Sequence, residues 1–175
     1  DYRDFAILYR TNAQSRVVEE SMMRHGIPYR IVGGVKFYKR KEIKDMISYL
    51  RLIENPADGV SLLRIINTPP RKIGTRTLEI LNDLARARGD EPLYTVMRDI
   101  EAIGENRLPE TKMMTLKKFV KIIHKMQQVN REYQASGVIK HLIEESGYKD
   151  FLLDGSEDGE TRFENVRELI SGQQI

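Results

Sequence analysis

The chain contains no cysteine among its 175 residues, so it can form neither a disulfide framework nor a thiolate metal site. That composition fits a reducing interior. The sequence also lacks any apolar run that approaches the roughly 18 residues needed to cross a bilayer. Its first stretch, DYRDFAILYR, does not have the basic and then apolar layout of a signal peptide. We therefore expect a soluble, cytoplasmic protein with no membrane partner.

The chain also has little net charge. Its 29 lysines and arginines stand against 26 aspartates and glutamates, which leaves a formal net charge of +3. So small an excess does not by itself indicate nucleic-acid binding, and the argument must rest on where the cations lie.

Residues suited to metal or catalytic chemistry are sparse. His25, His124 and His141 are scattered, and no carboxylate stands at metal-ligand spacing to two of them. Glu144 and Glu145 lie on a charged helix face without a partner that indicates acid–base chemistry. The G-x-x-x-x-G-K-[ST] loop, whose lysine and hydroxyl hold ATP and Mg²⁺, is missing. We expect no metal site, no catalytic residue and no cofactor in this chain.

Two short apolar runs frame the first part of the chain. FAILY at residues 5–9 and YRIV at residues 29–32 have the pattern of strands. Between them, residues 13–25 carry apolar side chains at helical spacing: Val17, Val18, Met22 and Met23. Such a strand–helix–strand piece needs a larger sheet to bury both strand faces, and the remaining sequence supplies no further clear strands. We therefore expect a piece of an α/β domain, and a fragment of something longer.

From residue 39 onward, apolar residues recur with a period of about 3.6, which predicts a succession of helices. The first is ended by Asn55 and Pro56, and the others span residues 61–66, 75–88, 93–103, 112–133, 138–146 and 162–170. The acidic stretch DGSEDGET before the last helix is expected to be a loop. The fold class is thus mainly α, a multi-helical domain preceded by the short strand–helix–strand piece.

The most interrupted stretch is NTPPRKIGTRTLEIL, where two prolines, a glycine and three basic residues separate two predicted helices. Its order of turn, apolar residue, glycine and helix matches the helix-hairpin-helix pattern. The first turn of the second helix leaves amides without intrahelical partners, and the helix dipole adds positive charge there. We expect this turn to bind DNA backbone without reading bases, through Thr68, Pro69, Arg71, Lys72, Ile73, Gly74, Thr75 and Arg76.

An alternative stays open for this turn, namely a helical hairpin ended by proline and glycine that merely carries surface cations. Lys72 stands where the pattern usually has its first glycine, and it adds a charge. Gly74 lets the backbone approach a ligand closely. Ile73 is expected to pack beneath the turn.

A second basic cluster is GGVKFYKRKEIKD, residues 33–45, in which five lysines and arginines surround two aromatic residues. Cations around exposed aromatics suit a nucleic-acid strand with bases to stack. We expect residues that bind DNA or form a hinge here: Gly33, Gly34, Lys36, Phe37, Arg40 and Lys41. For the aromatics, the favoured alternative is burial at a domain joint, with the lysines merely solvated.

A third cluster, YRTNAQSR at residues 9–16, follows the first predicted strand and leads into a helix. Ligands of open α/β sheets bind in the crevice at the carboxyl ends of the strands. One of Thr11 and Asn12 is expected to cap the helix. Arg10 is then free to contact a phosphate.

Three segments occur together here: AILYRTNAQSR, IPYRIVGGVKFYKRKEIKDMISYLRLIENPAD and LLRIINTPPRKIGTRT. As a set they resemble UvrD/PcrA/Rep-type superfamily 1 DNA helicases, over residues 5–81. The later helices and RFENVRELIS resemble the remainder of the same region more loosely. The resemblance implies that residues 1–33 are the end of motor subdomain 2A, and that residues 34–175 are the helical subdomain 2B.

The resemblance also implies roles for the clusters. The segment that matches Arg10, Thr11 and Asn12, with Arg16 close behind, would contact single-stranded DNA along the motor groove. The segment that contains the 68–75 turn would contact duplex DNA ahead of the fork. Rotation of 2B on hinges near Gly33 and the chain's end would regulate unwinding.

The parent protein implied by the resemblance is an ATP-dependent 3′–5′ DNA helicase of DNA repair or replication, which uses ATP and Mg²⁺. This fragment alone is expected to be inactive. Its expected partners are duplex or junction DNA, the remaining helicase subdomains, and repair or transcription proteins. The alternative function is a protein-interaction module that docks such a protein, or a second helicase copy, with DNA contact incidental.

Overall fold

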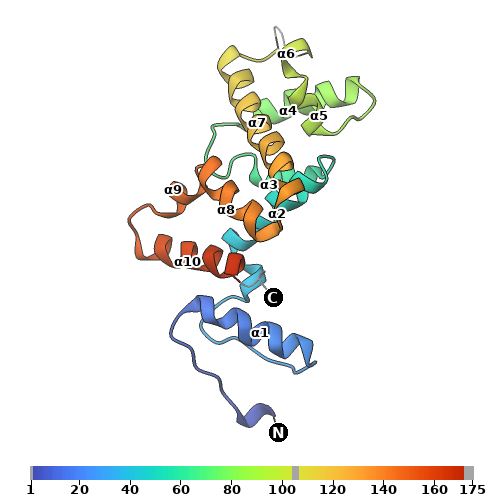
Figure 1. Ribbon diagram of the computed structural model, residues 1–175. Helices are drawn as coiled ribbons and strands as arrows, with labels where there is room; N and C mark the ends of the chain where they lie inside the picture. The colour runs from blue at the N-terminus through green and yellow to red at the C-terminus, as the bar shows by residue number, and fades with distance from the viewer. Residues whose placement is uncertain (1, 104–106, 172–175) are drawn as a thin grey trace.

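The computed structural model describes residues 2–103 and 107–171 as a chain of helices (Figure 1). The first part of the chain, up to α1, lies at one end of an elongated molecule, α4, α5 and α6 lie at the other, and α10 lies between them. The α-helices are α1 Ser15–Arg24, α2 Lys41–Glu54, α3 Gly59–Ile65, α4 Thr75–Ala87, α5 Leu93–Arg98, α6 Ile100–Ile103, α7 Glu110–Glu132, α8 Ala135–Glu145, α9 Tyr148–Leu152 and α10 Glu157–Ser171. Three short 3₁₀ helices, η1 Tyr2–Asp4, η2 Asn12–Gln14 and η3 Phe37–Lys39, join them.

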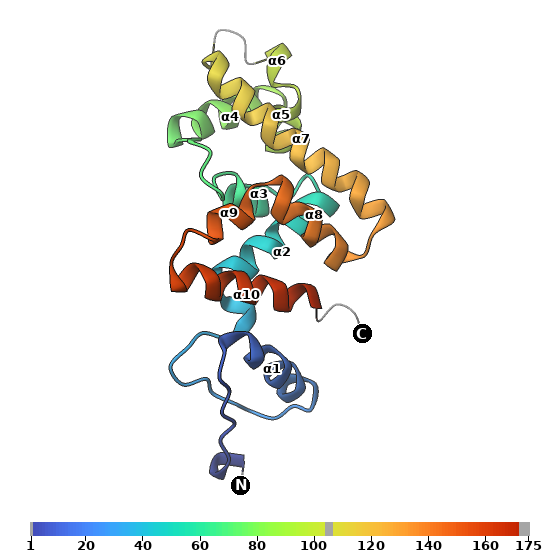
Figure 2. The same ribbon diagram turned by 60° about the vertical axis from the view of Figure 1, so that its left-hand side comes forward.

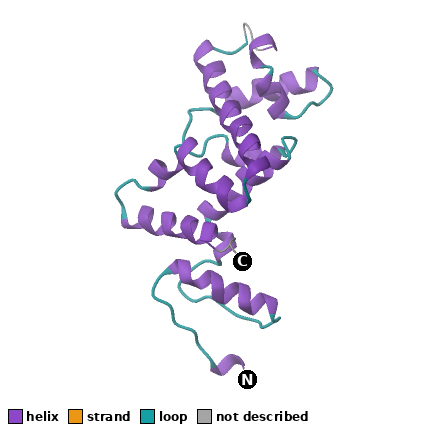
Figure 3. Cartoon of the chain, viewed as in Figure 1, coloured by secondary structure: helices purple, strands orange, loops and turns teal. Residues whose placement is uncertain are grey.

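The predicted strand–helix–strand piece is wrong in its strands. Residues 5–9 and 29–32 run as irregular backbone, and the described part of the chain contains no strand (Figure 3). Phe5 is 80% exposed and Leu8 is 93% exposed. A strand needs neighbours that satisfy its backbone groups and cover its faces, and two short isolated segments do not supply them. The predicted helix between them forms as α1, and the domain division at residue 33 stays a prediction.

The hydrophobic core lies around α2, which runs through the middle of the body and packs against α3, α7, α8 and α10 (Figure 2). The predicted apolar stripe of this helix faces inward, with Ile43 and Met46 fully buried. The long helix α7 buries Leu116 and Phe119 against the same core and extends to α5 and α6. One core therefore carries both the central helices and the α4–α6 end.

Helix ends depart from the sequence expectation near the end of the chain. The predicted helix 93–103 is divided into α5 and α6, and α9 was not predicted. Helix α10 begins at Glu157, inside the stretch expected to be a loop. The Ser156 hydroxyl caps this helix, because it accepts a hydrogen bond from the Gly159 amide at 2.9 Å. A side chain at Gly159 would collide with the Leu152 carbonyl, since its Cβ would lie 2.2 Å away. This close approach lets α10 turn back against the end of α9.

A buried polar cluster ties α2, α3 and α9 together. The Asp45 side chain is 2% exposed and accepts a hydrogen bond from the Tyr148 hydroxyl at 2.8 Å. It also pairs with the Arg64 guanidinium at 2.7 Å. Burial, followed by the charge of Asp45, raises the pKa of the Tyr148 hydroxyl, so this group stays a proton donor. The buried carboxylate is thereby satisfied from two sides.

None of the helices in the part of the chain that the structure describes is long and apolar enough to cross a membrane.

Replacing Tyr148 by Phe should lower the free energy of unfolding by about 1.5 kcal/mol, because the buried Asp45 carboxylate loses one of its two partners. Urea denaturation of the two chains measures the difference. Tyr133→Phe is the matched control, since Tyr133 is 49% exposed and should change stability by less than about 0.5 kcal/mol. Equal losses in both variants would contradict the role given to the Tyr148 hydroxyl.

Candidate nucleic-acid interface

The turn predicted to bind DNA joins the end of α3 to the start of α4. An asparagine that the sequence prediction did not include closes it. The Asn67 side-chain oxygen accepts hydrogen bonds from the amides of Ile73, at 3.0 Å, and Arg71, at 3.3 Å, and its nitrogen donates to the Ile73 carbonyl. Ile73 is 2% exposed, so it packs beneath the turn as expected. The Asn67 side chain therefore holds the two ends of the turn together.

Arg71 holds the same turn to the core. Its Nη1 donates to the carbonyls of Ile65, at 2.9 Å, and Ile66, at 3.1 Å, at the end of α3. The Ile65 carbonyl also accepts the Thr68 amide at 3.0 Å. Its Nη2 donates to the Tyr49 hydroxyl at 2.8 Å, and its guanidinium carbon lies 5.1 Å from the centre of the Phe119 ring. Most donors of this guanidinium are thus occupied within the protein. A contact of Arg71 with DNA stays a prediction.

Two further residues of the predicted set belong to this internal network. The Thr68 carbonyl accepts the Tyr49 hydroxyl at 2.6 Å, and the Pro69 carbonyl accepts Arg71 Nη1 at 3.2 Å. Both residues are half-buried. The first half of the predicted site is therefore built into the turn.

Lys72 is exposed and has a φ of +58°, the left-handed region that favours glycine. This conformation costs a residue with a side chain about 1 kcal/mol. The turn therefore keeps the backbone shape that a glycine would adopt there, and places a lysine in it.

The first amides of α4 are open to solvent. Gly74 caps the helix with extended backbone, and the amides of Gly74, Thr75 and Arg76 have no acceptor among the described residues. Neither the φ of Gly74, −86°, nor crowding requires a glycine there, because a Cβ would meet nothing within 4 Å. The helix dipole adds positive charge at the same place.

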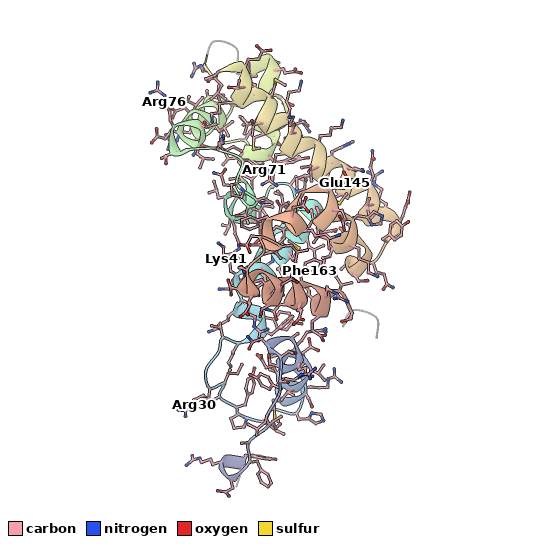
Figure 4. The ribbon with its side chains drawn as sticks, turned by 90° about the vertical axis from the view of Figure 1, so that its left-hand side faces the viewer. Arg30, Lys41, Arg71, Arg76, Glu145 and Phe163 are labelled. Atoms are coloured by element: carbon pink, nitrogen blue, oxygen red, sulfur yellow. The ribbon has the colours of Figure 1, made fainter. Side chains whose placement is uncertain are left out.

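Gly74 and Arg76 line a groove of about 690 Å³ between the start of α4 and the start of α7. The charged residues in the described part of its lining are all basic: Lys72, Arg76, Arg107 and Lys112. Figure 4 shows Arg76 at the outer edge of the molecule beside α4, while Arg71 lies nearer its middle. Of the predicted set, Lys72, Gly74 and Arg76 line this cationic groove.

The other basic clusters meet at a joint between α1 and the helical body. Arg16 is 5% exposed, donates to the Glu168 carbonyl at 2.7 Å and pairs with Glu20 at 2.8 Å. Phe37 is fully buried, and its amide donates to the Glu19 carboxylate at 3.0 Å. The alternative for Phe37, burial at a joint, is the one that the structure shows.

Arg40 crosses this joint. It donates to the Asn165 side chain at 2.6 Å, the Ser15 hydroxyl at 2.8 Å and the Asn12 carbonyl at 2.9 Å. Its guanidinium carbon also lies 5.2 Å from the Phe37 ring centre. Burial lowers the pKa of Arg40, an effect opposed by the charges of Glu19 and Glu42, and the arginine stays charged. Arg16 and Arg40 therefore connect protein segments, and their contacts with DNA stay predictions.

The remaining predicted residues lie around this joint. Arg10 is exposed at the start of η2, where the Gln14 side chain accepts the amides of Arg10, at 3.0 Å, and Thr11, at 3.2 Å. Gly33 and Gly34 are exposed in the loop that follows α1, and Gly33 has a φ of +76°. Lys36 Nζ lies 4.5 Å from the centre of the Tyr29 ring, and the Lys41 side chain is exposed at the start of α2.

Within residues 2–103 and 107–171, no three histidine, aspartate or glutamate side chains are grouped so that they could hold a metal ion.

Comparison with known proteins identifies the family of this chain. Residues 1–172 match the family described as the UvrD-like helicase C-terminal domain. The chain belongs to this family. It is 42% identical over 170 residues to DNA helicase II of Haemophilus influenzae and 39% identical over 171 residues to the ATP-dependent DNA helicase PcrA of Staphylococcus epidermidis. DNA helicase II of Salmonella typhimurium is 39% identical over 167 residues.

The matches cover 96%, 97% and 95% of this UvrD-like domain, and each covers 23% of the relative. The chain therefore spans about a quarter of the length of the relatives it matches.

Sequence reasoning on the UvrD-like domain missed four residues of the candidate interface: Tyr49, Asn67, Arg107 and Lys112. The place of Asn67 between a helix and a Thr-Pro turn is a signal that a turn-closing side chain is present. The others had no local signal, because Lys112 reaches the Lys72 carbonyl, at 2.5 Å, from 40 residues away.

Replacing Arg71 by Ala should lower the free energy of unfolding by about 3 kcal/mol, because the carbonyls that end α3 and the Tyr49 hydroxyl lose a shared donor. Chemical denaturation measures this loss. The control is Arg76→Ala, which removes an exposed arginine of the same turn and should change stability by less than about 0.5 kcal/mol. If both substitutions leave stability unchanged, Arg71 does not hold the turn.

Proposed function

We propose that this chain is the end of motor subdomain 2A, residues 1–33, and the helical subdomain 2B, residues 34–175, of an ATP-dependent 3′–5′ DNA helicase that acts in DNA repair or replication. Its task there is to hold the backbone of duplex or junction DNA. Membership of the UvrD-like family supports the helicase context. The names of the relatives, DNA helicase II and ATP-dependent DNA helicase PcrA, support the activity of the longer protein.

The observation that carries this proposal is the exposed start of α4. Three adjacent amides, from Gly74, Thr75 and Arg76, lack acceptors among the described residues, and Lys72 and Arg76 stand beside them. Backbone amides at a helix start bind phosphate oxygens well, because the donors converge and the dipole favours negative charge. Such contacts position a duplex but read no base. The turn is therefore suited to sequence-independent binding of DNA.

Within this proposal, Arg71 shapes the turn, and the exposed residues supply the contacts. The turn stays fixed because Arg71 and Asn67 hold it from inside. A rigid turn loses little conformational freedom when it binds, which favours affinity.

The remaining helicase subdomains are the partners proposed for the α1 end. Helix α1 turns its polar residues Ser15 and Glu19 inward, at 1% and 3% exposure, and leaves Val17 64% exposed and Met23 54% exposed. The exposed apolar residues Ile7 and Leu8 line an open hollow with Val17. Apolar surface gathered in this way marks an interaction site. We propose that it packs against the rest of the motor.

Single-stranded DNA is proposed to pass at the start of η2, where the Arg10 side chain is exposed. ATP and Mg²⁺ would be bound by other parts of the longer protein. On this proposal the chain alone hydrolyses no ATP. Rotation of the helical body near Gly33 would have to open the Arg16 and Arg40 contacts at the joint.

A second candidate function, docking of a repair or transcription protein or a second helicase copy, is favoured by one observation. Val60 is 83% exposed and Leu63 is 49% exposed on the outside of α3. Binding through such a surface would change little with salt, whereas phosphate-dominated binding falls steeply as salt rises.

The proposal predicts that the chain binds blunt duplex and a hairpin with a 3′ single-stranded tail, in a salt-dependent way. Replacing both Lys72 and Arg76 by Gln should weaken binding to all duplex sequences alike and reduce the slope of log affinity against log salt by about 0.9 per lost contact. Fluorescence anisotropy at several salt concentrations measures both effects.

The control removes two exposed charges elsewhere, in Arg131→Gln with Lys140→Gln. This variant should bind as the unchanged chain does. If the Lys72 and Arg76 variant also binds unchanged, the turn is not the DNA contact, and salt-independent binding of proteins through α3 becomes the better account.

A further inference from the structure

The groove beside the turn has two walls, and only one of them is formed by residues of the turn and the start of α4. Its first wall is formed by Lys72, Gly74 and Arg76. Its second wall is formed by residues 107–109 and Lys112, at the start of α7. The two walls come from segments about 40 residues apart in the chain, and the groove between them measures about 690 Å³.

The charges of the groove are unbalanced. Lys72, Arg76 and Arg107 are exposed, and none of them has an ion pair or side-chain hydrogen bond with another described residue. Among the described residues that line the groove there is no carboxylate. Like charges held close together repel one another, and an anion between them relieves this repulsion. The floor is partly apolar, since Leu108 is 6% exposed and Ile80 is half-buried.

Lys112 joins the two walls. Its Nζ donates to the Lys72 carbonyl at 2.5 Å, so the α7 wall is fixed relative to the left-handed residue of the turn. An ammonium has three donors, and this bond uses one of them. The other two are available to an anion in the groove. Lys112 is therefore both a positioning residue for the turn and a cation of the site.

Both walls are also helix starts. Gly74 caps α4, which has 13 residues, and Pro109 caps α7, which has 23. Each dipole adds positive potential on its side of the groove, and this potential adds to the four basic side chains. The groove therefore has positive potential on both of its walls. This arrangement suits an extended anion that passes between the walls better than a compact anion bound at one wall.

We propose that the groove holds one strand of the DNA backbone between its walls, with Arg107 and Lys112 binding a phosphate next to the one bound by the turn. This inference rests on the proposed function, because it assigns the second half of the same interface. It adds Arg107 and Lys112 to the DNA-binding residues. The chemistry recognised is the phosphodiester backbone of duplex DNA, for which inorganic phosphate is the small-molecule equivalent.

The test compares three variants with the unchanged chain, in anisotropy titrations of blunt duplex over a salt series. The first is Arg107→Gln with Lys112→Gln, and the second is Arg107→Gln alone, which leaves the Lys112 bond to the turn in place. The third is Lys118→Gln with Lys121→Gln, a control of equal charge change at exposed positions farther along α7. Thermal unfolding of each variant shows whether the fold is kept.

The double α7 variant should reduce the salt slope by about 1.8, two contacts at about 0.9 each, and weaken binding at low salt roughly tenfold or more. Arg107→Gln alone should reduce the slope by about half of that. The control should leave both quantities unchanged. These results would support a strand held by both walls.

Two results would overturn the inference. If Lys72→Gln with Arg76→Gln reduces the slope while the α7 variants do not, DNA touches the turn only, and the proposed function stands without the second wall. If neither wall changes duplex binding, the proposed function fails as well. A calorimetric titration with inorganic phosphate distinguishes one further outcome. If the α7 variants lose phosphate binding but bind duplex DNA unchanged, the groove is a site for small anions and the inference is wrong.

Discussion

The candidate interface depends on the guanidinium of Arg71. Arg71 satisfies the carbonyls that end α3 and reaches the Tyr49 hydroxyl on α2, with the Phe119 ring of α7 beside it. Because these bonds join the turn to three helices of the core, the direction in which α4 starts is fixed by packing rather than by the loop alone. The open amides at Gly74 and the cations of the groove follow from that direction. A turn of this kind presents donors without rearranging, which is what preorganised anion binding requires.

The two ends of the molecule use charge in different ways. At the α1 end, arginines make contacts within the protein: across the joint, Arg16 binds the carbonyl and the carboxylate of Glu168, and Arg40 binds the side-chain amide of Asn165. At the α4 end, basic side chains stand around a groove without acidic partners among its lining residues. Breaking a partly buried ionic contact is unfavourable when one partner is left without compensation. The contacts of Arg16 and Arg40 therefore oppose motion at the joint. The basic side chains of the groove remain available to bind an anion.

Much of the helical body could be predicted because its signals are local. The stripe of α2 and the glycine before α4 act within one or two turns of helix, and both were placed correctly. The strands were wrong because the apolar run at residues 5–9 indicates a tendency toward burial, not the neighbouring strands that a strand requires. The internal contacts of Arg71 were equally hard to predict, because a basic residue in a turn can bind either a phosphate or the carbonyls at a helix end. Only the fold brings Ile65 and Tyr49 close to it. Lys112 had no local signal at all.

The most direct test of the account is a titration of the isotope-labelled chain with a DNA hairpin that has a 3′ tail, followed by backbone amide resonances. The account predicts that the largest shifts occur at Lys72, Gly74, Thr75 and Arg76, whose amides would meet phosphate oxygens, with smaller shifts across the core. Shifts confined to the outside of α3 or to α8, with these four amides unchanged, would contradict it.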